Sequence, residues 1–155
     1  MKNLIILFFA FSLSSFLVFS QKNPPENVKK EFIKKFPSAQ SVKWGNEDKT
    51  EWEAEFIADG KRISASYDNT GKWIESETKI TEKELPATIT NTINKDFQGY
   101  KKGEIEIFEN SEMKGYELSL LKGEKSVEVI IDNNGKIIKK TDKKEKDEKN
   151  EKEEK

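Results

Sequence analysis

Apolar residues recur at every second position in several stretches of this chain, which predicts β-strands. Two such stretches are EWEAEFIA at 51–58 and RISASY at 62–67, and the same alternation occurs in YELSLL at 116–121 and SVEVIID at 126–132. Successive side chains of a strand point to opposite faces of its sheet. Each stretch therefore presents one apolar face to a core, and its charged or small polar residues lie on the other face.

Two further stretches change to a helical period. PENVKKEFIKKFP at 25–37 and LPATITNTINKDFQG at 85–99 each carry apolar residues four positions apart, namely Val28, Phe32 and Phe36 in one and Ile89, Ile93 and Phe97 in the other. A proline precedes each stretch, as suits the first turn of a helix. Amphipathic helices are predicted at both places.

An Asp-Asn-x-Gly motif occurs twice, in SYDNTGKWIES at 66–76 and IIDNNGKIIKK at 130–140, with Asp68 and Asp132 separated by 64 positions. Val28 and Ile89 in the two helical stretches are separated by 61. We therefore predict an α+β fold of two tandem helix–four-strand repeats, at about 25–80 and 84–138, with an antiparallel sheet and the helices packed on one face.

The Asp-Asn-x-Gly motifs are interpreted as turns, because Asp favours the first position of a type I turn and Gly accepts a positive φ. A calcium loop is the alternative. It would need oxygen ligands spread through a longer loop that ends in a Glu, and neither copy has this pattern.

The two ends of the chain differ from the middle. Residues 1–20 combine Lys2 with a long apolar run and small residues before Gln21, as in a cleaved signal peptide, with a membrane anchor as the alternative. Residues 139–155 hold eight Lys, seven Asp or Glu and no apolar residue, which predicts a disordered tail or a solvated helix. One domain at 21–138 is expected between them.

Composition excludes several classes of function. The chain has no His and no Cys, so His-dependent triads, Cys nucleophiles and His/Cys zinc sites are impossible. Its 28 Lys and Arg nearly balance its 29 Asp and Glu, which favours neither nucleic acid nor an acidic membrane surface as a partner. After signal cleavage we expect an exported protein, periplasmic or secreted, that is not bound to a membrane.

The order of motifs resembles a known family. KKFPSAQSVKW, WEAEF, YDNTGKWIESETKI and ELPATITNTI, at 34–44, 52–56, 67–80 and 84–93, are similar to the exported bacterial domains called PepSY-like or β-lactamase-inhibitor-like. The resemblance covers about 25–138. It implies a sheet whose helix-free face is left open for a partner protein, with no cofactor and no catalysis. Gly99 and Tyr100 depart from the pattern, since Pro37 and Ser38 hold the equivalent positions of the first half.

Four residues are candidates for binding a partner on the helix-free face: Trp73, Arg62, Glu53 and Glu75. Trp and Arg are enriched among the residues that dominate interfaces, and Trp73 falls on the charged face if Ile74 points toward the helices. The alternative is that Trp73 only covers neighbouring strands. The Glu-x-Glu pattern at 51–55 is also compatible with a glycosidase pair or a weak cation site, although a solvated sheet face produces it without any function.

These observations favour a non-enzymatic binding or inhibitory module that engages a protein or peptide in the cell envelope through the helix-free face. No catalytic, cofactor or metal residues are predicted. The alternative is a structural or stress-related envelope protein without a discrete binding site. Identification of a captured partner would separate the two hypotheses.

Overall fold

The computed structural model describes residues 22–46 and 50–143, so the predicted signal peptide at 1–20 lies outside the described residues. Two helices, α1 (Glu26–Lys35) and α2 (Ala87–Asp96), and a short 3-10 helix, η1 (Glu82–Glu84), accompany eight strands. The strands are β1 (Gln40–Asn46), β2 (Glu51–Ala58), β3 (Lys61–Asp68), β4 (Trp73–Lys79), β5 (Lys101–Asn110), β6 (Lys114–Lys122), β7 (Lys125–Asp132) and β8 (Ile137–Lys143). No helix in the described part is long and apolar enough to cross a membrane.

Both helices form where the four-residue period predicted them. Val28 and Phe32 are the buried residues of α1, and Ile89 and Ile93 are those of α2. A proline occupies the N-cap position of each helix, where its missing N–H leaves no hydrogen bond unmade. Each helix therefore presents one narrow apolar side to the sheet.

The eight strands form a single antiparallel sheet in the order of the sequence, from β1 to β8. Strand β4 pairs directly with β5, for instance through Thr78 and Ile107. The prediction of two tandem helix–four-strand repeats at 25–80 and 84–138 is therefore wrong as a description of the architecture. This is an α+β fold built on one continuous sheet with two short helices. Pairing β4 with β5 satisfies backbone groups that two separate sheets would leave exposed at their edges.

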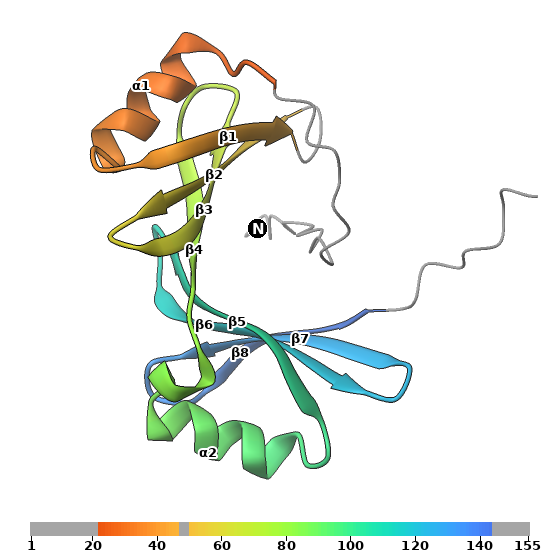
Figure 1. Cartoon of the computed structure of the whole chain (residues 1–155). Helices are drawn as coiled ribbons and strands as arrows, with labels where there is room; N and C mark the ends of the chain where they lie inside the picture. The colour runs from red at the N-terminus through yellow and green to blue at the C-terminus, as the bar shows by residue number, and fades with distance from the viewer. Residues whose placement is uncertain (1–21, 47–49, 144–155) are drawn as a thin grey trace, which may run out of the picture.

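Both helices pack on the same side of this sheet (Figure 1). Helix α1 contributes Val28 and Phe32 to a cluster with Phe56 and Tyr67, and α2 contributes Ile89 and Ile93 to a second cluster on strands β5 to β7. One row of directly paired residues lies on this side of the sheet and includes a residue from every strand from β2 to β8. In order, its members are Phe56, Ile63, Thr78, Ile107, Tyr116, Ile131 and Ile137. The sheet bends so that its two ends approach each other on the side without helices (Figure 1).

The Asp-Asn-x-Gly turns are confirmed as turns. The Asp68 carboxylate accepts hydrogen bonds from the backbone N–H groups of Thr70 and Lys72 at 2.8 and 3.0 Å. Gly71 has φ +86°, and a Cβ there would lie 2.9 Å from the Asn27 carbonyl oxygen of α1. Only glycine accepts both the backbone conformation and the close approach of the helix. The Asp68 carboxylate is thus engaged in building the turn.

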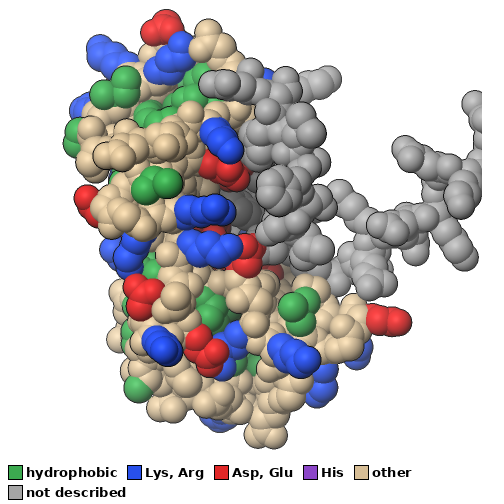
Figure 2. Space-filling model, in the orientation of Figure 1, with side chains coloured by type: hydrophobic (Ala, Val, Ile, Leu, Met, Phe, Trp, Pro, Cys, Tyr) green, Lys and Arg blue, Asp and Glu red, His purple; other side chains and the backbone are tan. Residues whose placement is uncertain are grey.

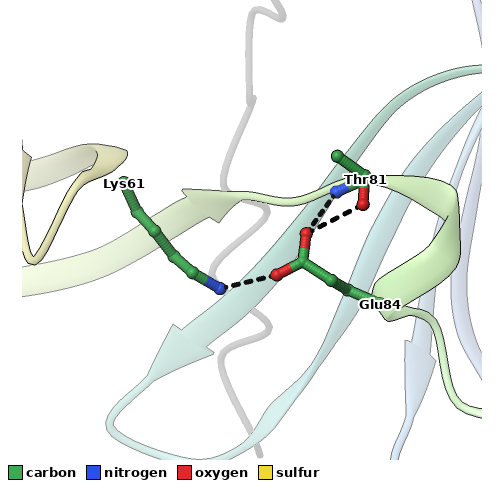
Figure 3. Close-up of polar contacts among 3 residues, drawn as sticks. All are labelled: Lys61, Thr81 and Glu84. Atoms are coloured by element: carbon green, nitrogen blue, oxygen red, sulfur yellow. Dashed lines mark hydrogen bonds and ion pairs between the residues drawn. The ribbon is translucent and has the colours of Figure 1, made fainter.

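The connection between β4 and α2 is held by a capping box (Figure 3). The Glu84 carboxylate accepts hydrogen bonds from the N–H and the hydroxyl of Thr81 at 2.8 and 3.0 Å, and it pairs with the Lys61 ammonium at 2.9 Å. These contacts, the Lys61 hydrogen bond first, lower the pKa of Glu84 to about 2. The start of β3 is thereby tied to the segment that leads into α2.

Strand β8 corrects the predicted extent of the charged tail. Residues 139–143 belong to this strand, where Lys139 pairs with Ile130 and Thr141 pairs with Glu128 of β7. The tail prediction is therefore wrong for 139–143, and its remainder at 144–155 lies outside the described residues. An edge strand needs no apolar pattern of its own, because it is held by backbone hydrogen bonds to its neighbour, and Lys is common there.

Candidate binding face

The side of the sheet opposite α1 and α2 is rich in carboxylates. We call it the open face, because neither helix covers it (Figure 1). In one row of paired residues Glu53 and Glu75 lie on either side of Ser66, and in another Glu106 and Glu117 are direct partners on β5 and β6. Register therefore brings together side chains that are far apart in the sequence.

At the centre of the open face, the carboxyl group of Glu117 contacts two other carboxyl groups. Glu117 forms side-chain hydrogen bonds with both Glu77 and Glu128, and the Ser64 hydroxyl donates to Glu77 Oε2 at 3.3 Å. A hydrogen bond between two carboxyl groups requires that one of them keeps its proton. Burial, and next the repulsion of neighbouring carboxylates, raises the pKa of both Glu77 and Glu117. The pair consequently retains protons at neutral pH.

Three other carboxyl groups on this face titrate near neutrality. The pKa of Glu53, Glu75 and Glu106 is raised from 4.5 to about 7, first by burial and then by the charges of nearby glutamates. Lys139 opposes this effect at Glu75, and Lys79 opposes it at Glu106. Like charges in a confined space disfavour ionisation. The open face therefore gains negative charge as the pH rises through about 7.

Two apolar side chains interrupt the carboxylates. Phe108 pairs with Glu77 across β4 and β5, and Ile130 pairs with Glu117 across β6 and β7, so both point to the open face. Phe108 and Ile130 are 4% and 9% exposed, yet neither belongs to the two clusters under the helices. Both side chains are therefore buried on this side of the sheet, whereas Ile57 of β2, the partner of Arg62, is 41% exposed.

Sequence reasoning missed Phe108 and Ile130, although a signal for both was present. The alternation that turns Val129 and Ile131 toward the helices places Ile130 on the opposite side. In EIEIF at 104–108, the same alternation groups Phe108 with Glu106.

The structure brings three of the four predicted site residues to the open face. Glu53 and Glu75 share a row with Ser66 between them, and Arg62 lies near the start of β3 as the exposed partner of Ile57. In the part of the chain that the structure describes, no three acidic side chains form a group suited to a metal ion. The arrangement offers negative charge beside one exposed apolar side chain, Ile57, which suits binding to a cationic surface.

Trp73 lies on the other side of the sheet, so its expected position on the charged face is wrong. The β3–β4 register shifts between Ser66 and Tyr67, which makes Trp73 the partner of Tyr67 rather than of a polar residue. The Lys35 ammonium of α1 lies 3.5 Å from the centroid of the Trp73 ring. A β-bulge reverses the face of every residue on one side of it, and alternation alone does not reveal it.

Basic and acidic side chains are interspersed over the visible surface in Figure 2, and apolar areas there are small and separate. Four large apolar side chains are exposed among the described residues, namely Ile33, Ile57, Leu121 and Ile138. They come from four different elements, α1, β2, β6 and β8, and Ile57 is the one among them that pairs with Arg62.

A profile of the family described as "Putative beta-lactamase-inhibitor-like, PepSY-like" matches residues 50–139 of the chain. A search of the curated proteins found no match. The matched residues comprise β2 to β7 and the beginning of β8, and they include every carboxylate discussed above for the open face.

Solved structures show the same fold. A BLIP-like protein from Bacteroides fragilis is similar with a TM-score of 0.72 and 18% identity, covering 84% of this chain and 94% of that one. A DUF2874 family protein from Bacteroides ovatus has a TM-score of 0.71 and 18% identity, covering 78% and 89%. A protein from Bacteroides eggerthii, named among "putative periplasmic proteins", has a TM-score of 0.70 and 17% identity, covering 78% and 90%.

Proposed function

Because this chain belongs to the PepSY-like, beta-lactamase-inhibitor-like family, we propose that it is an exported, non-enzymatic binding module whose open face receives a protein or peptide partner. The family name describes inhibitor-like rather than catalytic proteins. Export is supported by the signal-like sequence of residues 1–20 and by the "putative periplasmic" description of the Bacteroides eggerthii protein. The bacterial envelope is then the place where the partner is met.

The observation that carries this proposal is the composition of the open face. Ile57, 41% exposed, provides apolar area beside its partner Arg62, while Glu53 and Glu75 supply carboxylates on the same face. Interfaces commonly combine an apolar centre with a polar rim. Arg62, at the start of β3, adds a cation near the edge of this face.

The charge of the face selects the kind of partner. Carboxylates from β2, β4, β5, β6 and β7 meet there, and Lys79 is already paired with Glu104. A partner that presents Lys or Arg beside an apolar side chain complements this surface, because opposite potentials steer association and favour the correct register. Affinity for such a partner falls as the pH drops below about 7, since Glu53, Glu75 and Glu106 then bind protons.

The proposal is tested by capture from an envelope fraction on the immobilised protein, followed by affinity measurement with the purified partner. We expect Ile57→Ala and Glu53→Gln each to weaken binding by about tenfold, the effect of losing a central interface contact. Ile33→Ala is the matched control, because Ile33 is 63% exposed on the outer side of α1. Circular dichroism verifies that each variant is folded.

The alternative of a structural or stress-related envelope protein makes a different prediction. If it is correct, the wild type, the two open-face variants and the Ile33→Ala control should all capture the same proteins from the envelope fraction, or none of them should capture any. Such a result would remove the open face as a binding surface. A partner lost from Ile33→Ala alone would place the interface on the helical side instead.

A further inference from the structure

A second candidate site lies on the opposite side of the sheet from the open face, between α1 and the β3–β4 turn. It is an open recess of about 560 Å³. Its lining includes Glu31, Lys34, Lys35, Tyr67, Lys72 and Trp73. Its volume is within the range of about 300–1,000 Å³ that is usual for small-molecule sites.

Two buried donors at this recess have no hydrogen-bond partner. The hydroxyl of Tyr67 and the indole N–H of Trp73 are both unpaired, and the Tyr67 side chain is 0% exposed. Buried polar groups are nearly always hydrogen-bonded, so each exception requires an explanation. An indole nitrogen can only donate, so the group missing beside Trp73 is an acceptor.

The rim of the recess is positively charged. Lys34 and Lys35 come from α1, and Lys72 comes from the turn. Glu31 is the one carboxylate lining it among the described residues, and it pairs with Lys34 at 3.4 Å. Three cations and one carboxylate leave a formal charge of +2 at the rim. The acceptor that fits is therefore negatively charged.

The frame around the recess is fixed by hydrogen bonds. The Asn27 side chain of α1 donates to the Asn69 carbonyl at 3.1 Å, and Gly71 lies against the Asn27 carbonyl. The N–H groups of Thr70 and Lys72 are already bonded to Asp68. The turn thus has a fixed position on the helix, and the donors left for a ligand are those of Tyr67, Trp73 and the lysines.

We propose that this recess binds a carboxylate on an organic molecule. The carboxylate oxygens accept hydrogen bonds from the Tyr67 hydroxyl and the Trp73 indole, and Lys35 and Lys72 balance the charge. Lys35 moves from its place over the indole ring to the ligand, which opens the path to both donors. The recess is much larger than an inorganic ion, and the Trp73 ring offers a surface for the rest of the molecule.

The test follows the indole N–H signals of the full-length protein by two-dimensional ¹⁵N nuclear magnetic resonance. The probes are benzoate and a tripeptide with a free C-terminal carboxylate, each compared with its neutral amide, and inorganic phosphate. We expect the Trp73 signal to shift with one or both acids and not with the amides. The Trp52 signal stays in place, because its N–H already donates to Asn69 Oδ1 at 2.9 Å. Tighter binding of benzoate identifies a small acid as the ligand, and tighter binding of the tripeptide identifies a chain terminus.

Matched variants separate binding from folding. Tyr67→Phe removes one donor and keeps its ring, so it should weaken binding, followed by the Trp73 signal, by about fivefold or more. Tyr67→Phe should not lower the melting temperature, because the hydroxyl is unpaired without ligand. Lys83→Gln, an exposed change on η1, leaves binding unchanged.

Three results would overturn the proposal. The first is a Trp73 signal that does not move with either acid, which would leave the two donors to water alone. The second is equal binding of an acid and its amide. The third is phosphate binding as tightly as both acids, because charge alone would then account for the site.

Discussion

The single carboxyl group of Glu75 makes protein stability depend on pH. Its pKa is about 7 in the folded protein against an ordinary value of 4.5, because it is buried and because Glu51, Glu128 and Glu53 repel its charge more than Lys139 attracts it. The folded state thus binds a proton that the unfolded state releases between these two values. Stability contributed by Glu75 is full below about pH 4.5 and is lost as the pH rises through about 7.

We therefore expect Glu75→Gln to stabilise the protein by about 1–3 kcal/mol at about pH 8 and to have little effect at about pH 5. Urea denaturation midpoints at the two pH values measure this difference. Glu124→Gln, in the exposed turn between β6 and β7, is the control and should change neither midpoint. A gain of equal size at both pH values would contradict the role of charge.

The side of the sheet on which Trp73 lies could not be predicted from the sequence. Alternation predicted its neighbours correctly, since Glu75 and Glu77 do lie on the open face. One extra residue at the bulge between β3 and β4 turned Trp73 toward α1. A bulge depends on hydrogen bonding between two strands, so the sequence of one strand carries no clear sign of it.

At the scale of elements, the end of β8 is open to a direct test. Truncation after Ile138 removes five pairings with β7, from Ile130–Lys139 to Ser126–Lys143. It also leaves β7 without a partner on its outer edge along Ser126 to Ile130, where it remains paired only with β6. We expect the melting temperature to fall by about 5 °C or more.

Truncation after Lys143 should leave the melting temperature unchanged, because residues 144–155 contain no apolar side chain to bury. Scanning calorimetry of the two truncated proteins beside the full chain distinguishes the two effects. An equal loss in both would mean that the tail beyond Lys143 contributes to the fold.

Elements with a strong apolar period were predictable, and those without one were not. The helices at Val28 and Ile89 and the hairpin at Asp59–Gly60 follow from local signals, and both turn residues indeed have positive φ. Strand β8 continues past Ile138 with only Lys, Thr and Asp. It is a strand because its backbone pairs with that of β7. Pairing through the backbone requires no particular side chains, so the sequence of an edge strand does not reveal it.

At the scale of the whole molecule, the sequence does not predict how the two similar halves join. Similar segments predict similar local structure, but they do not say whether β4 pairs with β5. That pairing joins Thr78 to Ile107 and closes one sheet in place of two units. It also determines the open face, because Glu77 and Glu117 could not meet if their strands belonged to separate sheets.

Because the sheet is continuous, a mutation that destabilises the strands on one side of the β4–β5 pairing should also lower the stability of the strands on the other side. Phe56 is 2% exposed, and its ring centroid lies 5.0 Å from that of Phe32 and 4.7 Å from that of Phe36. Phe56→Ala should cost about 3–5 kcal/mol, as is usual for truncation of a buried Phe. The row from Phe56 through Ile63, Thr78 and Ile107 to Ile131 is unbroken, so the loss should be shared by the whole sheet.

Native-state hydrogen exchange measures how far this loss extends. In Phe56→Ala, the most protected amides of β6 and β7 should lose the same free energy of protection as those of β2 and β3, because global unfolding exposes them all together. Val129→Ala, in the cluster under α2, is the reciprocal variant and should lower protection in β2 and β3. If each variant instead weakened only its own strands, the β4–β5 pairing would be a weak link between two units that unfold separately.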